Sequence, residues 1–150
     1  MDSLRIDNGT KKINVNDEGE CIEFSIVNND FFRAFFDLLR WFDEQEGRKE
    51  IKEMEENADK VVSDDEKEIN YDAANSMLDI RDKISREACE KIDNIFGCEA
   101  SRKIFGSVAP DMYMIADFFE KISPLIEKYQ KERSQTINKK YSKNRKGAKS

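Results

Sequence analysis

The stretch Phe31-Phe32-Arg33-Ala34-Phe35-Phe36-Asp37-Leu38-Leu39-Arg40-Trp41-Phe42 decides the fold that this sequence predicts. It contains five of the ten Phe residues and the single Trp of the chain. On a helix that turns about 100° per residue, its apolar side chains cover an arc of about 220°. A surface helix needs an apolar stripe of only about 100°. We therefore expect a helix that is covered on more than one side, by the rest of the chain or by a partner.

The centre and the edges of this arc are expected to have different roles. The side chains expected in the core are Phe31, Phe35, Leu38 and Phe42. The edges hold three further aromatic residues, Phe32, Phe36 and Trp41, which are candidates for binding a partner because large aromatics at the border of a core are typical anchors of interfaces. Burial in the core border is the competing interpretation for these three residues.

Alternating apolar residues upstream of the helix predict a small antiparallel sheet. The alternation covers residues 4–6, 13–15 and 22–26, and the turn signals Asp7-Asn8-Gly9 and Asn16-Asp17-Glu18-Gly19 separate these segments. The three strands would form a β-meander with one apolar face. Such a sheet is marginally stable alone, so we expect the aromatic helix to cover it.

Helical patterns continue to about residue 131. The first helix is expected to begin after a cap within residues 28–30 and to end near Gly47. A charged helix to about residue 60, a long helix over residues 71–96 and a short one between 98 and 105 follow. The last helix begins near Asp111, and Pro124 is expected to kink or divide it. The predicted fold class is α+β and mostly helical, with an N-terminal antiparallel β-meander packed on a bundle of four to five helices.

The charge distribution separates a body from a tail. Residues 131–150 carry eight Lys or Arg and one acid, a net charge of +7, whereas residues 1–130 carry 18 Lys or Arg and 31 acids, a net charge of −13. We expect residues 1–130 to form a single domain and residues 131–150 to be a mobile basic tail. The tail could contact an acidic partner or nucleic acid through Lys139, Lys140, Lys143, Arg145 and Lys146. Nucleic-acid binding is disfavoured, because the acidic body repels phosphate and only Tyr141 could stack on a base.

The composition argues against an enzyme. The chain has no His, which removes the commonest general base and most zinc sites, and its three Cys cannot complete a four-thiolate site. No glycine-rich phosphate loop and no calcium loop occurs. We expect no catalytic, cofactor-binding or metal-binding residues and no cofactor. The odd Cys count is typical of a reducing cytoplasm, and no apolar run is long enough for a membrane span.

Short motifs in a fixed order identify a resemblance. The turn Asn16-Asp17-Glu18-Gly19 leads into the Phe-rich helix, and a basic end closes the chain. Between them lie Ile92-Asp93-Asn94-Ile95-Phe96-Gly97, Ile104-Phe105-Gly106 and Phe118-Phe119-Glu120 with Ile122. In this order the chain resembles the tail assembly chaperones encoded in the tail-gene modules of phages and prophages of Gram-positive bacteria.

The resemblance implies a non-enzymatic function in the cytoplasm of the bacterial host. Such a chaperone binds the long helical tape measure protein, keeps it soluble, and gives way as the major tail protein polymerises. Self-association, and a longer form made by ribosomal frameshifting, are compatible with this function. Two alternatives stay open. The first is a helical adaptor or regulatory protein that contacts nucleic acid or an acidic partner through its basic tail, and the second is a structural subunit retained in the finished phage tail.

Overall fold

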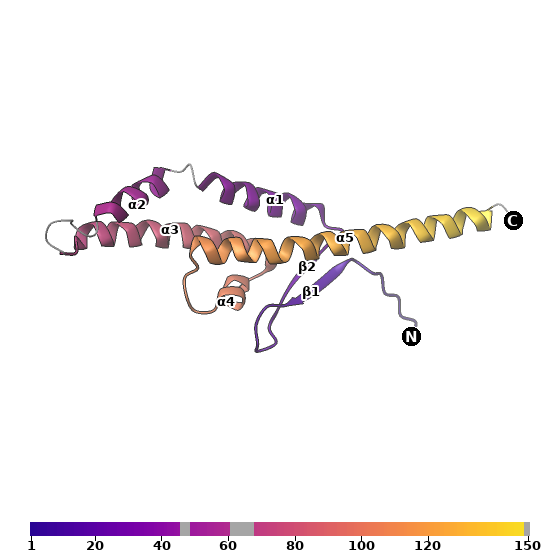
Figure 1. The fold of residues 1–150 in the computed structure, drawn as a ribbon. Coiled ribbons are helices and arrows are strands. Elements are labelled where there is room, and N and C mark those ends of the chain that lie inside the picture. Colours follow the sequence, from indigo (N-terminus) through magenta and orange to yellow (C-terminus); the bar gives the residue numbers. More distant parts are fainter. Residues whose placement is uncertain (46–48, 61–67, 149–150) are drawn as a thin grey trace.

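The fold is α+β and mostly helical in the computed structural model, which describes residues 1–45, 49–60 and 68–148. Two antiparallel strands, β1 (Thr10–Asn14) and β2 (Cys21–Ser25), precede the helices. The helices are α1 (Asn29–Glu44), α2 (Lys49–Lys60), α3 (Tyr71–Phe96), α4 (Ala100–Phe105) and α5 (Met112–Ala148). Figure 1 shows an elongated molecule, in which α1, α3 and α5 run lengthwise and the hairpin and α4 lie below α5. The expected fold class is confirmed.

The hairpin contains two of the three expected strands. Ile13 pairs with Ile22 in the antiparallel register, and the Asn16 side chain closes the turn by accepting the N–H groups of residues 18 and 20 at 3.0 and 3.1 Å. The expected strand at residues 4–6 is wrong, because residues 1–9 contain no strand. The carboxylate of Asp7 accepts the Gly9 N–H at 3.0 Å, and the Asn8 side chain accepts the Thr10 N–H at 3.1 Å. These local hydrogen bonds replace the hairpin turn that the same residues predict.

The aromatic helix α1 begins as expected. The side chain of Asn28 accepts the N–H of Asp30 at 3.0 Å and so caps the helix. Phe31, Phe35 and Leu38 are buried, which confirms their assignment to the core. The fourth expected core residue is half-buried: Phe42 packs edge-to-face on Phe119, with ring centroids 5.2 Å apart. The helix is described to Glu44, and its expected stop at Gly47 lies outside the described residues.

The long helix α3 has the bounds that its sequence predicts. Its first turn is capped by Asn70, whose side chain accepts the N–H of Ala73 at 3.1 Å. Gly97 ends the helix at a φ of 110°, a conformation that favours glycine. The carboxylate of Asp93, in the last turn of α3, accepts the Ser101 N–H at 2.7 Å. This hydrogen bond holds the start of α4 against the end of α3.

The last helix, α5, is longer than the sequence predicts. Pro124 lies inside it, and the expected division into two helices is wrong. The missing N–H of Pro124 leaves the carbonyl of residue 120 without its helical partner, but both residues are exposed, so water can bond that carbonyl. The helix continues through residues 131–148, which we call the arm. The mobility that we expect for this segment is a separate property and stays a prediction.

The core is built around the ring of Phe96, at the end of α3. Its centroid lies 6.0 Å from Phe24 of β2, 5.7 Å from Phe31, 6.3 Å from Phe35 and 5.8 Å from Phe118 of α5. All four pairs are edge-to-face, an arrangement favoured by the quadrupoles of the rings. The hairpin, α1, α3 and α5 therefore meet at one aromatic cluster.

Candidate binding surfaces

The aromatic edges of α1 are only partly available to a partner. Phe36 is 57% exposed, and the ring of half-buried Phe32 lies 6.1 Å from it. Trp41 is half-buried against the core, with the ammonium of Lys91 5.5 Å from the centroid of its ring. Phe36 is thus the single predicted anchor that faces mainly solvent, and the partner-binding function of all three residues stays a prediction.

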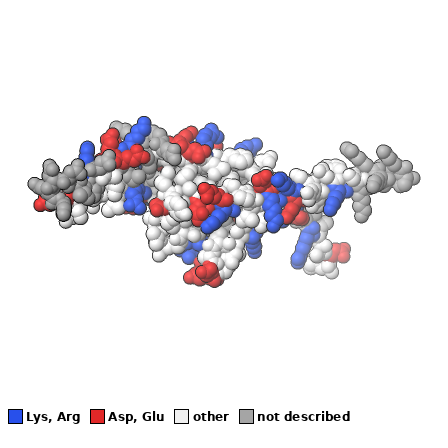
Figure 2. Space-filling view, viewed as in Figure 1, with Lys and Arg blue, Asp and Glu red and all other residues white. Residues whose placement is uncertain are grey.

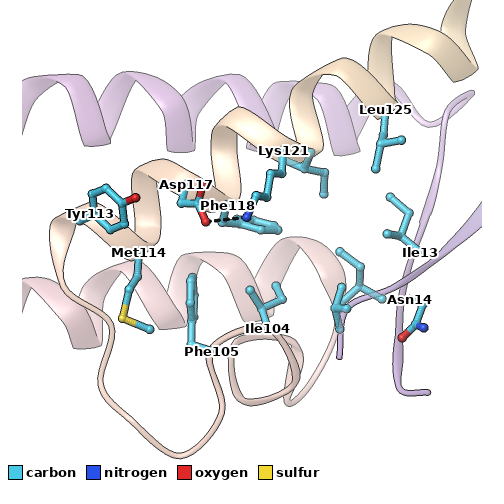
Figure 3. A pocket seen from close by; sticks show the side chains of 13 residues that line it. Ile13, Asn14, Ile104, Phe105, Tyr113, Met114, Asp117, Phe118, Lys121 and Leu125 are labelled. Carbon is cyan, nitrogen blue, oxygen red and sulfur yellow. Dashed lines mark hydrogen bonds and ion pairs between the residues drawn. The ribbon is translucent and has the colours of Figure 1, made fainter. Parts of the chain in front are cut away.

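A larger candidate is an apolar groove between the hairpin, α4 and α5 (Figure 3), with a volume of about 380 Å³ and open to solvent. β1 contributes Ile13, and α4 contributes Ile104 and Phe105. The remaining lining residues are Asn14, Val15, Ile22, Tyr113, Met114, Asp117, Phe118, Lys121, Ile122 and Leu125. The lining offers mainly aliphatic and aromatic carbon, so the groove is suited to apolar side chains and not to a charged ligand.

The wall formed by α5 follows from helical spacing. Met114, Phe118 and Leu125 are spaced by four and seven residues, which places them on one side of the helix. Figure 3 shows Met114 and Phe118 on the side of α5 toward the Phe105 and Ile104 side chains of α4, and Leu125 beside Ile13 of β1. The Phe105 and Phe118 rings pack edge-to-face, with centroids 6.0 Å apart. This contact joins α4 to α5 in the lining of the groove.

The charges at the groove are neutralised in pairs. The Lys121 ammonium lies 2.9 Å from the Asp117 carboxylate, whose hydrogen bond and charge raise the pKa of Lys121. Near the outer side of α4, Arg102 lies 2.9 Å from the Glu20 carboxylate. The hydrogen bond from Arg102 lowers the pKa of Glu20, and the same bond raises the pKa of Arg102. This second pair ties α4 to the hairpin turn.

Sequence reasoning did not identify the groove. Ile115, Phe119 and Ile126 of α5 are buried in the core. The line of Met114, Phe118 and Leu125, on an adjacent side of the helix, was the available signal. No comparable signal marks α4, because a helix of six residues is too short to show a period.

The arm places part of the predicted basic tail in solvent. Lys139 and Lys140 are exposed, and Lys143, Arg145 and Lys146 belong to the same helix, although their side chains lie outside the described residues. At the base of the arm, the Arg133 guanidinium contacts the Asp7 carboxylate at 3.0 Å and donates to the Asp7 carbonyl at 3.2 Å. The arm and the aromatic edges of α1 are therefore separate surfaces.

The described residues include no group of three or more His, Cys, Asp or Glu side chains that could hold a metal ion. Within the same residues, no helix is both long and apolar enough to cross a membrane.

The fold and these surfaces describe a small helical protein with an apolar groove. The chain belongs to DUF6673, a family of unknown function whose model matches residues 18–150. The match includes β2 and all the helices, but not β1. No significant match was found among curated proteins or among solved structures.

Proposed function

We propose that the protein is a phage tail assembly chaperone that binds the helical tape measure protein in the bacterial cytoplasm and keeps it soluble. It performs no covalent chemistry and uses no cofactor. The major tail protein then displaces it as the tail polymerises around the tape measure. The observation that carries the proposal is the open apolar groove between the hairpin, α4 and α5.

The groove matches the apolar stripe of a client helix. An amphipathic helix presents apolar side chains at intervals of three and four residues, and a hydrophobic groove on a partner can receive that row. The ion pair of Asp117 and Lys121 at the groove neutralises both side chains, so an apolar client meets no unpaired charge there. The acidic body, with a net charge of −13 over residues 1–130, favours solubility of the complex through mutual repulsion.

Co-expression with the tape measure protein tests the proposal. We expect the wild-type chain to raise the soluble yield of the tape measure protein. Met114→Glu and Leu125→Glu each place a charge on a half-buried groove side chain and should abolish this effect. The matched control is Val27→Glu, between β2 and α1 and outside the groove, where the wild-type side chain is 47% exposed.

Circular dichroism should show that all three variants keep their helix content. A wild-type chain without effect on tape measure solubility would refute the proposed function. Folded groove variants that still solubilise the client would refute the assignment of the groove. The variant Phe36→Ser tests the exposed edge of α1. Loss of client binding by this variant would show that the edge joins the contact, and unchanged binding would show that it does not.

The exposed basic arm favours a second candidate, a helical adaptor that contacts an acidic partner or nucleic acid. Truncation after Arg133 removes Lys139 and Lys140 and keeps the contact with Asp7. For an adaptor of nucleic acid, this truncation should abolish binding, and the affinity of the intact chain should fall steeply with salt. Failure of the intact chain to bind nucleic acid at low salt would exclude that form of the candidate.

A further inference from the structure

The arm carries an apolar line beside its basic residues. Ile137 is 40% exposed and Tyr141 is 64% exposed, and their spacing of four residues places them on one face of α5. Figure 2 shows Lys and Arg side chains recurring along this part of the molecule. An isolated helix of this length is marginal in water, so an arm that projects from the body gains stability when its face is covered.

The first half of α3 carries the complementary surface. Tyr71 is 72% exposed and Leu78 is 46% exposed, and their spacing of seven residues places them on one line of the helix. Beside this line, Asp72, Asp79 and Asp82 are all exposed, as are Arg81 and Lys83 among them. Within the described residues, none of these three carboxylates forms an ion pair.

We propose that the arm of one copy packs along the first half of α3 of a second copy. Ile137 and Tyr141 lie against Tyr71 and Leu78. Lys140, which is next to Ile137 and Tyr141 around the helix, faces the aspartates of α3, whereas Lys139 lies on the opposite side of the arm. A second copy is the partner that the charges favour, because the same chain supplies a tail of +7 and a body of −13. Two arms would repel each other, which disfavours a symmetric pairing of arm with arm.

The two surfaces lie at opposite ends of the molecule. Figure 1 shows the start of α3 at one end and the arm at the other, so the arm cannot reach the α3 of its own chain. The contact therefore joins two copies. A reciprocal pair, in which each arm lies on the other's α3, is a closed two-fold dimer, whereas a one-way contact leaves each copy with one free arm or one free α3 surface. Repetition of such a contact produces a ring if the rotation closes and an open filament if it does not. This self-association needs no tape measure protein, so it can fail or succeed independently of the proposed function.

Two charge-reversal variants test the contact. The arm variant carries Lys140→Glu, and the α3 variant carries Asp82→Lys, which lies on the line of Tyr71 and Leu78. We expect concentration-dependent assembly of the wild type in sedimentation velocity at low salt, and assembly at least roughly tenfold weaker for each variant. The control Lys139→Glu makes the same change in net charge as the arm variant, at an exposed residue on the opposite side of the arm, and should assemble like the wild type.

Mixing the two variants gives the decisive result. The α3 variant keeps a native arm that fits the native α3 of the arm variant, and the reversed arm is complementary to the reversed α3, so the mixture should assemble more strongly than either variant alone. A chain that carries both reversals should assemble again for the same reason. A wild type that stays monomeric over the whole concentration series would overturn the proposal. Folded variants that assemble like the wild type, or a mixture that forms no complex, would also overturn it.

Discussion

Replacement of Phe96 tests whether the aromatic cluster holds the fold together. Its side chain is 5% exposed, and a Phe side chain buries about 200 Å². At about 25 cal/mol per Å², this burial corresponds to about 5 kcal/mol, an upper estimate because the unfolded chain is partly compact. We expect Phe96→Ala to lower the free energy of unfolding by about 4 kcal/mol, within the range for buried Phe-to-Ala changes. That is a large part of the stability of a typical domain.

Urea denaturation followed by circular dichroism measures this loss. The matched control is Phe36→Ala on α1, because the same area estimate for a side chain 57% exposed gives only about 2 kcal/mol. Phe96→Leu keeps most of the volume and removes the ring, and it should cost less than about 1.5 kcal/mol. If Phe96→Ala and Phe36→Ala differ by less than about 1 kcal/mol, Phe96 is not the centre of the core.

Three further predictions concern single sites. Arg102 holds the pKa of Glu20 below its ordinary value of 4.5, so the pair stabilises the fold at neutral pH, and this stabilisation is lost as the pH falls below 4.5. The urea midpoints of Glu20→Gln and the wild type should therefore differ at pH 7 and converge in acid. Burial raises the pKa of the half-buried Cys89 thiol, whereas Cys98 is exposed. Mass spectrometry of an alkylation time course should therefore find Cys98 modified first, and faster labelling of Cys89 would contradict this packing. Pro124→Ala restores a helical N–H inside α5. Urea denaturation should show that the free energy of unfolding rises by about 1–3 kcal/mol. A loss of stability would show that the helix is divided at this residue in solution.

Local signals in the sequence predict the helices well. A cap within residues 28–30 and the dense aromatic pattern after it define α1, and the apolar spacing over residues 71–96 with Gly97 after it defines α3. These features succeed because each acts on the turn of helix next to it. The core residues of α1 follow from helical periodicity, since Phe31, Phe35 and Leu38 share one side of the helix and are all buried.

The errors occur where one residue has two local uses. Asp7 and Asn8 are typical of a hairpin turn, but their side chains bond the backbone of Gly9 and Thr10 instead, and the third strand does not form. A proline inside a helix usually kinks or breaks it. At Pro124 the helix continues, because the carbonyl of residue 120, which loses its helical partner, is exposed to water. Local propensity does not decide between such outcomes.

The groove could not be predicted, because it is a property of three elements that are distant in the chain. Ile13, Phe105 and Phe118 become neighbours only when the hairpin, α4 and α5 have packed. By contrast, the basic tail was visible in the sequence because charge is counted residue by residue. The helical backbone of the tail could not be predicted, because the tail lacks the periodic apolar residues that mark a packed helix.

The Phe96 cluster also has a consequence for the newly made chain. Its members run from Phe24 to Phe118, so the ribosome must add more than half of the protein after the first ring before the last one exists. At about 5–20 residues per second, the aromatic hairpin and helix wait on the order of ten seconds for their final cover. During that interval the growing chain itself exposes the kind of apolar surface that other proteins recognise, and its early acidic residues are what keep neighbouring nascent chains apart.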